Sequence, residues 1–206
     1  MGAGQEFVSW QVEQGSSAFA VNTALGEAPT LTPDERSRVI ALVRESAGRG
    51  VPIIAGICTS CTAQGVAEAL RAQAAGADAL LLSAPPYNRP STEGVLLHLE
   101  SIIAATELPI LVQNDPERTR VDLGPNSLVR LAARANVLGI VDGTGEVAAI
   151  SGAHTALSSY TTRDALSAPF LMAGVVSALA NITPRLCAQL HLSVCAGLFS
   201  QATAIQ

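Results

Sequence analysis

Four acidic residues follow apolar segments, at points where the chain turns polar and rich in glycine or threonine. They are Glu27, Asp115, Asp142 and Asp164. Carboxylates that converge on one face of a protein can hold Mg²⁺ or Mn²⁺, and such an ion polarises a keto acid. No histidine joins them, and aspartate is common in loops, so we expect no metal and no cofactor. Metal-assisted catalysis stays open as an alternative.

All 12 basic residues are arginine, and the chain contains no lysine. Arginine stays protonated and cannot serve as an amine nucleophile.

Among the four cysteines, Cys58 and Cys61 form a C-x-x-C pair, and Cys61 falls near a predicted helix start, where a thiolate is favoured. Cys187 and Cys195 are about 12 Å apart along a predicted helix, too far for a disulfide. We interpret all four as structural thiols without a redox role.

The composition predicts a protein with a large aliphatic core. Hydrophobic residues make up 49% of the chain, charged residues 14% and aromatic residues 3%. The net charge is −5 and no basic cluster appears, so neither nucleic acid nor an anionic membrane is an expected partner. No leader and no apolar run of spanning length is evident, and we expect a cytoplasmic protein. The histidines His98, His154 and His191 fall on predicted helices or their ends and are expected at the surface.

Short apolar runs alternate with helical patterns along the whole chain. A helix at 5–14 precedes strands at 17–22, 51–57, 77–85, 108–114, 137–141, 155–161 and 175–181, each followed by a polar loop and a helix. Near-continuous apolar strands are typical of parallel sheets, and strict alternation allows an open doubly wound sheet or a β/α barrel. No G-x-G-x-x-G follows the first strand, and polar residues follow every strand, as on a barrel's active face. We therefore predict one α/β barrel domain over residues 1–206.

Five segments carry a resemblance to a known family. "NTALGEAPTLTPDER", "VPIIAG", "PPYNRPSTEG", "LPILVQNDPERT" and "VLGIVDGTG" are similar, in order and spacing, to dihydrodipicolinate synthase and N-acetylneuraminate lyase. The resemblance runs from about residue 5 to the C-terminus. It implies a (β/α)8 TIM barrel, pyruvate-type Schiff-base lyase chemistry and a homo-oligomer.

The resemblance also implies that the barrel is partial. Family members begin with an extra strand before the helix at 5–14 and carry further helices after the last segment here. We therefore expect strands two to eight of the barrel, without the first strand and the C-terminal helices. A missing strand would leave two unpaired edges. Either the start lies upstream, or the barrel closes unusually, or another chain covers the gap.

The family's catalytic positions are altered in this sequence. Val141 falls where the family has the lysine that forms the imine, which needs an amine of lowered pKa. Gln113 stands at the position where the family has the phenol that shuttles protons, and an amide has no usable pKa for that task. The paired threonines of a substrate loop fall on Ala24 and Leu25. Gly26 remains, so backbone N–H groups of this loop could still face a carboxylate.

Other family positions are retained. Tyr87 matches a tyrosine that reaches a neighbouring subunit's proton relay, and Arg118 matches the arginine that meets a substrate carboxylate, a role suited to its planar fork. Val176 falls where a backbone carbonyl contacts the bound keto acid. Loop-shaping positions are Asn88, Pro90, Asn114, Pro116 and Thr119.

Three hypotheses follow from these residues. The first is a homologue without lyase activity, acting as the partner of an active paralogue or as an inert, truncated gene product. The second is an enzyme of altered, metal-assisted lyase or dehydratase chemistry on a keto or sugar acid. The third is a small-carboxylate-binding subunit that uses Arg118 and the loop around Gly26.

Overall fold

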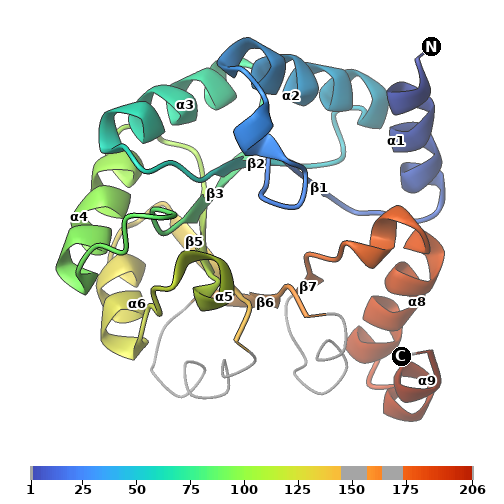
Figure 1. The fold of residues 1–206 in the computed structure, drawn as a ribbon. Helices are drawn as coiled ribbons and strands as arrows, with labels where there is room; N and C mark the ends of the chain where they lie inside the picture. Colours follow the sequence, from blue (N-terminus) through green and yellow to red (C-terminus); the bar gives the residue numbers. More distant parts are fainter. Residues whose placement is uncertain (1, 145–156, 164–173, 206) are drawn as a thin grey trace.

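In the part of the chain that the structure describes, seven parallel strands form one sheet, with helices on its outer face (Figure 1). The computed structural model describes residues 2–144, 157–163 and 174–205. The strands lie in sequence order, each paired in parallel with the next. Because a doubly wound sheet reverses its strand order and this one does not, the predicted barrel topology is confirmed. The strands are β1 (Phe19–Val21), β2 (Ile53–Ile57), β3 (Ala79–Ser83), β4 (Ile110–Asn114), β5 (Val137–Asp142), β6 (Ser158–Thr161) and β7 (Gly174–Val175).

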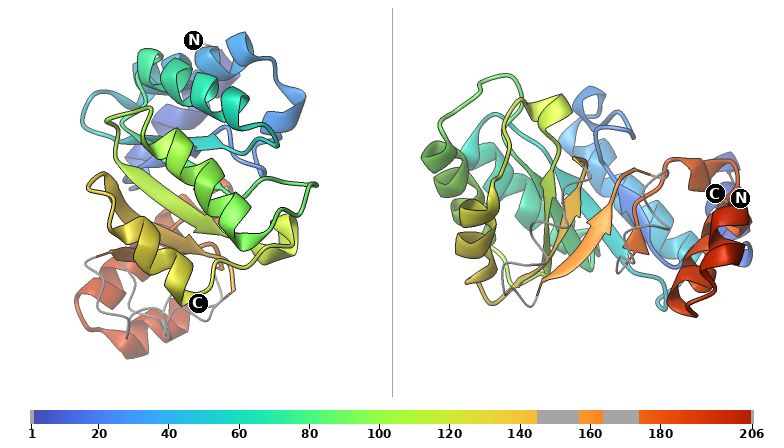
Figure 2. Two further views of the ribbon diagram at one scale, coloured as in Figure 1. Left: turned by 90° about the vertical axis from the view of Figure 1, so that its left-hand side faces the viewer. Right: turned by 90° about the horizontal axis from the view of Figure 1, so that it is seen from below.

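The described helices surround this sheet, and Figure 2 shows α4 and α6 lying across its outer face. They are α1 (Ala3–Glu13), α2 (Pro33–Ala47), α3 (Thr62–Ala74), α4 (Thr92–Ile103), α5 (Pro116–Thr119), α6 (Pro125–Ala132), α8 (Pro184–Cys195) and α9 (Phe199–Ile205). The start of α2 is fixed by a capping box between Thr32 and Glu35. The Glu35 N–H donates to Thr32 Oγ1 at 3.3 Å, and the Thr32 N–H donates to Glu35 Oε2 at 2.8 Å. None of the described helices has the length and apolar character that a membrane crossing requires.

Two apolar clusters lie on opposite faces of the sheet because successive strand residues point to opposite sides. The outer and larger cluster packs strand residues such as Leu80 and Ile140 against residues of the helices, such as Leu99. The inner cluster contains Leu81, Leu111 and Val141, with the partly buried Ile54, Tyr160 and Val176 packed against it. Both clusters are almost entirely aliphatic, as the composition predicts.

The first and last parts of the sheet come together near α1 and α8. Gln11 of α1 donates to Asn181 Oδ1 at 3.0 Å, and a Cβ added at Gly15 would lie 3.1 Å from Cβ of Ala188 in α8. Figure 2 likewise places α1 beside α8. Within the described residues β1 pairs only with β2, and β7 only with β6. In the described residues the two ends of the sheet are thus joined only by contacts near α1 and α8, and β1 and β7 are not paired with each other.

Several sequence predictions need correction. The strand predicted at 175–181 is short: β7 ends at Val175, and Leu179–Asn181 forms a 3₁₀ turn. The last helix is divided into α8 and α9, with Gly197 at a φ of 72° between them. The short helix α5 was not anticipated.

The surface prediction for the histidines is wrong for His98. Its side chain is buried on α4, and its Nδ1 lies 2.9 Å from Thr62 Oγ1 of α3. Burial lowers its pKa, because the charged imidazolium would lose its hydration. His191 is half-buried on α8. His154 lies outside the described residues.

Candidate functional site

One row of register partners crosses the inner face near the carboxyl ends of the strands. The pairs run in series from Ser83 to Gln113, Val141, Tyr160 and Gly174, on β3 to β7. Residues paired in this way lie at one level of the sheet, on the same face. The two family positions on β4 and β5, Gln113 and Val141, are therefore direct neighbours, as a shared site requires.

Val141 is completely buried in the inner apolar cluster. Its neighbours there include Leu81 and Leu111, which lie one level deeper in the sheet. An aliphatic side chain in an aliphatic setting has no means of donating, accepting or attacking. The centre of the row therefore carries an aliphatic side chain.

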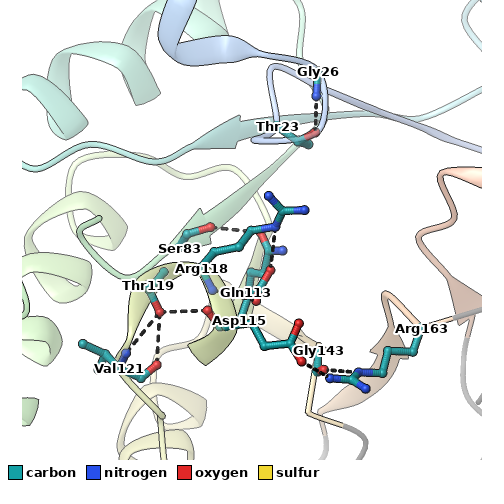
Figure 3. Close-up of polar contacts among 11 residues, drawn as sticks. Thr23, Gly26, Ser83, Gln113, Asp115, Arg118, Thr119, Val121, Gly143 and Arg163 are labelled. Carbon is teal, nitrogen blue, oxygen red and sulfur yellow. Dashed lines mark hydrogen bonds and ion pairs between the residues drawn. The ribbon is translucent and has the colours of Figure 1, made fainter. Parts of the chain in front are cut away.

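The polar part of the row lies on β3 and β4. Ser83 Oγ donates to Gln113 Oε1 at 2.9 Å (Figure 3). The Cys58 thiol follows β2, and its burial raises its pKa. A neutral thiol, a hydroxyl and an amide can orient a ligand oxygen, but they exchange no proton readily near neutral pH.

Arg118 occupies the mouth of the barrel on the short helix α5. Asp115 caps this helix by accepting the Arg118 N–H at 3.3 Å, and its other oxygen accepts from Arg118 Nε at 3.2 Å. In Figure 3 the guanidinium points toward the loop that carries Thr23 and Gly26. The Arg118 side chain is 52% exposed, and its terminal nitrogens have no partner in the part of the chain that the structure describes. A carboxylate can therefore reach its free edge.

The loop at 23–27 folds back on itself. The Gly26 N–H donates to Thr23 O at 3.1 Å and lies 3.3 Å from Thr23 Oγ1, and the Glu27 N–H donates to Ala24 O at 3.3 Å. The Ala24 and Leu25 side chains are exposed, and their N–H groups donate to no described residue. The anion site expected here is consequently reduced to the Ala24 and Leu25 N–H groups, because the Gly26 and Glu27 donors are already occupied.

Gly56 allows this loop to cross close above β2. A Cβ at Gly56 would lie 2.4 Å from the carbonyl oxygen of Asn22 and 3.1 Å from Cα of Thr23. Asn22 itself has a φ of 54° and donates its Nδ2 to the Arg36 carbonyl at 3.1 Å. The glycine and the asparagine together fix where the loop begins.

Arg163 is a rim residue that sequence reasoning missed. It follows β6, and its Nε donates to the carbonyl of Gly143 after β5 at 2.5 Å, while Nη2 contacts Glu117 of α5 at 2.5 Å. Figure 3 shows its side chain reaching across to that carbonyl. The only signal in the sequence was a basic residue in the polar segment after a predicted strand.

Asp142 points away from the inner face, because it directly follows Val141 on the same strand. It is fully buried, and it accepts from Asn114 Nδ2 at 3.3 Å and from the Thr144 N–H at 3.2 Å. Asp115 is engaged with Arg118, and Asp164 lies outside the described residues. Over residues 2–144, 157–163 and 174–205 no three His, Cys, Asp or Glu side chains are grouped to hold a metal ion.

Two further family positions lie at the edge of this site. Tyr87 is 94% exposed on the loop after β3 and has a φ of 72°, so it points into solvent. Asn88 holds that loop by donating to the Ser60 carbonyl at 3.2 Å. Val176 packs against the inner cluster, and its N–H donates to the Thr161 carbonyl at 2.9 Å.

These features define a parallel β/α barrel with a polar rim above an apolar centre. The family model of the dihydrodipicolinate synthetase family matches residues 2–206, and the chain belongs to that family. It is 38% identical to a 4-hydroxy-tetrahydrodipicolinate synthase of Sphingopyxis alaskensis, covering 96% of this chain and 70% of that protein. A synthase of the same name from Gluconacetobacter diazotrophicus is 36% identical, with 97% and 70% covered.

Solved structures agree with this assignment. The 4-hydroxy-tetrahydrodipicolinate synthase of Methylacidiphilum fumariolicum SolV superposes with a TM-score of 0.94 at 32% identity, covering 98% of this chain and 70% of that one. A chloride-inhibited dihydrodipicolinate synthase from Acinetobacter baumannii, complexed with pyruvate, gives a TM-score of 0.93 at 33% identity, with 98% and 72% covered. The predicted family and TIM-barrel fold are both confirmed.

Proposed function

We propose that this member of the family performs no Schiff-base lyase chemistry. The family resemblance places the imine-forming lysine at the position of Val141, which is fully buried among aliphatic side chains. All 12 basic residues of the chain are arginine. Since an imine needs a neutral amine and a guanidinium stays protonated, no side chain can form an imine with a ketone. The buried Val141 is the observation that carries this proposal.

The neighbouring position supports the same conclusion. A lyase of this kind must move protons while the carbon–carbon bond forms or breaks, and the family resemblance assigns that task to a phenol at position 113. Here Gln113 accepts a hydrogen bond from Ser83 Oγ. An amide can hold a ligand in this place but cannot serve as a general acid or base.

Reductive trapping tests the proposal. We expect no change in the intact mass after incubation with pyruvate and borohydride. A lysine-containing family member, treated in parallel, should gain one reduced pyruvate. An adduct on this chain in the folded state, absent when the chain is unfolded in urea, would contradict the proposal. The unfolded sample controls for the α-amino group of Met1.

A second function is favoured by the geometry of Arg118, and we propose that the barrel mouth binds small carboxylates without covalent chemistry. The free edge of the guanidinium faces the loop where the Ala24 and Leu25 N–H groups have no described partner. A guanidinium and backbone N–H groups are complementary to a carboxylate. Pyruvate and other short keto acids are the ligands to try first.

Calorimetry with pyruvate, 2-oxobutyrate and acetate tests this binding. We expect measurable heat with the wild type and at least a tenfold weaker affinity for Arg118→Gln, which keeps a hydrogen-bonding head but loses the charge. Arg49→Gln, on an exposed residue after α2, serves as the matched control. If none of the three ligands gives measurable heat, the proposed carboxylate binding is wrong, and only a scaffolding role remains.

Metal-assisted lyase or dehydratase chemistry is a further candidate, with less support from the geometry. Asp142 points away from the inner face, and Asp115 is paired with Arg118. Thermal unfolding with Mg²⁺ or Mn²⁺ should therefore give the same midpoint as with EDTA. A midpoint raised by a divalent ion, and lost in Asp115→Asn, would restore this candidate.

We also propose that the chain associates with a second copy or with an active paralogue. Tyr87 is 94% exposed, and Ile182 and Leu192 are large apolar side chains that are 74% and 65% exposed. Light scattering after size exclusion, with and without a lysine-containing paralogue, measures the assembly. A monomer in both samples would contradict this proposal.

A further inference from the structure

Tyr160 is the one aromatic residue of the inner cluster in the described chain. It is the register partner of Val141 on β5 and of Gly174 on β7, so its side chain starts at the level of the lost lysine. The ring packs against the cluster that contains Val141. An aromatic ring is therefore placed beside the position where the family's covalent chemistry would occur.

Gly174 on β7 makes room for this ring, and Gly139 on β5 lies on its other side. A Cβ built on Gly174 would lie 3.1 and 3.2 Å from two of its carbon atoms. A Cβ on Gly139 of β5 would lie 3.2 Å from a third, and its closest contact would be the Ser158 carbonyl oxygen at 2.6 Å. Non-bonded carbon atoms in van der Waals contact are about 3.5 to 4.0 Å apart. A larger residue at Gly174 would push the ring aside, and one at Gly139 would meet the Ser158 carbonyl first. The ring therefore packs between Gly139 of β5 and Gly174 of β7, in the cluster that contains Val141.

We propose that Tyr160 closes the inner face of the barrel to keto acids, so that losing the lysine is only one of two changes that end the chemistry. A lysine at position 141 would have to extend into the interior to meet a carbonyl, and the tyrosine ring packs on that inner face against the cluster that contains Val141. The closure also confines a bound carboxylate to the rim beside Arg118. This inference deepens the proposed absence of imine chemistry and depends on it.

Reductive trapping in four variants tests the closure. V141K supplies the amine, V141K/Y160S also removes the ring, V141K/Y160F keeps the ring without its hydroxyl, and Y160S alone controls for the amine. Each is treated with pyruvate and borohydride, and adduct at position 141 is measured by peptide mapping. We expect at least tenfold more adduct in V141K/Y160S than in V141K or V141K/Y160F, and none in Y160S. Equal trapping in V141K and V141K/Y160S, or no trapping in either, would overturn the inference.

A second measurement avoids burying an amine, in case the lysine variants do not fold. V141C is close to valine in size, and iodoacetate is a carboxylate about as large as pyruvate. We expect alkylation at position 141 to be at least tenfold faster in V141C/Y160S than in V141C or V141C/Y160F, with the four native cysteines resolved by peptide mapping. Equal rates would overturn the closure. The outcome does not depend on imine chemistry, so it separates this inference from the proposed function, which fails if the wild type itself forms an adduct.

Discussion

Arg163, at the end of β6, and Glu117, in α5, form an ion pair of 2.5 Å across the rim. Because Arg163 also donates to the Gly143 carbonyl after β5, one side chain joins the ends of three successive strands. Glu117 directly precedes Arg118 in a helix of a single turn. The ion pair therefore helps to fix the direction in which Arg118 points.

Replacing Arg163 should weaken carboxylate binding without unfolding the barrel. Both partners are largely exposed, so the ion pair contributes about 0 to 1 kcal/mol to the free energy of unfolding. For Arg163→Gln we expect roughly threefold to tenfold weaker binding of pyruvate, because Glu117 and Arg118 lose their common support. Calorimetry measures the affinity and urea unfolding the stability.

Arg49→Gln is the matched control for Arg163→Gln, since it removes the same charge far from the rim. An unchanged affinity in Arg163→Gln, or an equal loss in Arg49→Gln, would show that Arg163 does not support Arg118.

Gly56→Ala should destabilise the fold and displace the loop at 23–27. The added methyl group would lie 2.4 Å from the Asn22 carbonyl oxygen, so either β2 or the loop must move. We expect the free energy of unfolding to fall by about 1 to 3 kcal/mol, as measured by urea unfolding.

Gly50→Ala is the control for Gly56→Ala, because a Cβ there meets nothing within 4 Å. Its stability should change by less than about 1 kcal/mol. If both variants unfold at the same urea concentration as the wild type, the close crossing of the loop over β2 is wrong.

The free energy of unfolding should fall as the pH drops below 6.5, because His98 is buried in its neutral form. Burial lowers the pKa of His98 from its ordinary value of 6.5. Between this lowered pKa and 6.5, the unfolded chain therefore binds more protons than the folded chain. The free energy of unfolding then rises with pH through this window and levels off above 6.5. Urea unfolding from pH 5 to pH 8 measures the slope.

His98→Gln removes this titration while keeping a polar side chain near Thr62 Oγ1. We expect a lower stability at every pH, with the His98 part of the slope below pH 6.5 gone. The same slope in both proteins would assign the pH dependence to other groups.

Apolar periodicity predicted most of the strands, because each strand is a short buried run whose neighbours in sequence are also its neighbours in the sheet. It failed at 175–181, where Ser177 Oγ accepts the Ala180 N–H at 3.3 Å and favours a local turn. The burial of His98 was not predicted because it depends on a contact distant in the sequence. Its partner, Thr62, lies 36 residues earlier in the chain and on another helix.

The site was only partly predictable. Val141 and Gln113 came from the family resemblance, and the sheet register then made them neighbours. Tyr160 and Arg163 were missed, since their importance depends on register and on contacts with Gly174 and Glu117 that no sequence pattern records. Polar residues after a strand indicate a rim but do not say which side chains meet across it.

Hydrogen exchange at the methyl group of pyruvate is the most direct test of the central claim. An imine acidifies that methyl group, so even a short-lived imine would exchange its protons for deuterium in D₂O. With EDTA present, we predict that proton NMR shows the same exchange rate with the folded protein as with the chain unfolded in urea, each corrected for its protein-free buffer. A rate that rises in proportion to folded protein and exceeds the unfolded control would contradict the claim that this barrel has lost imine chemistry.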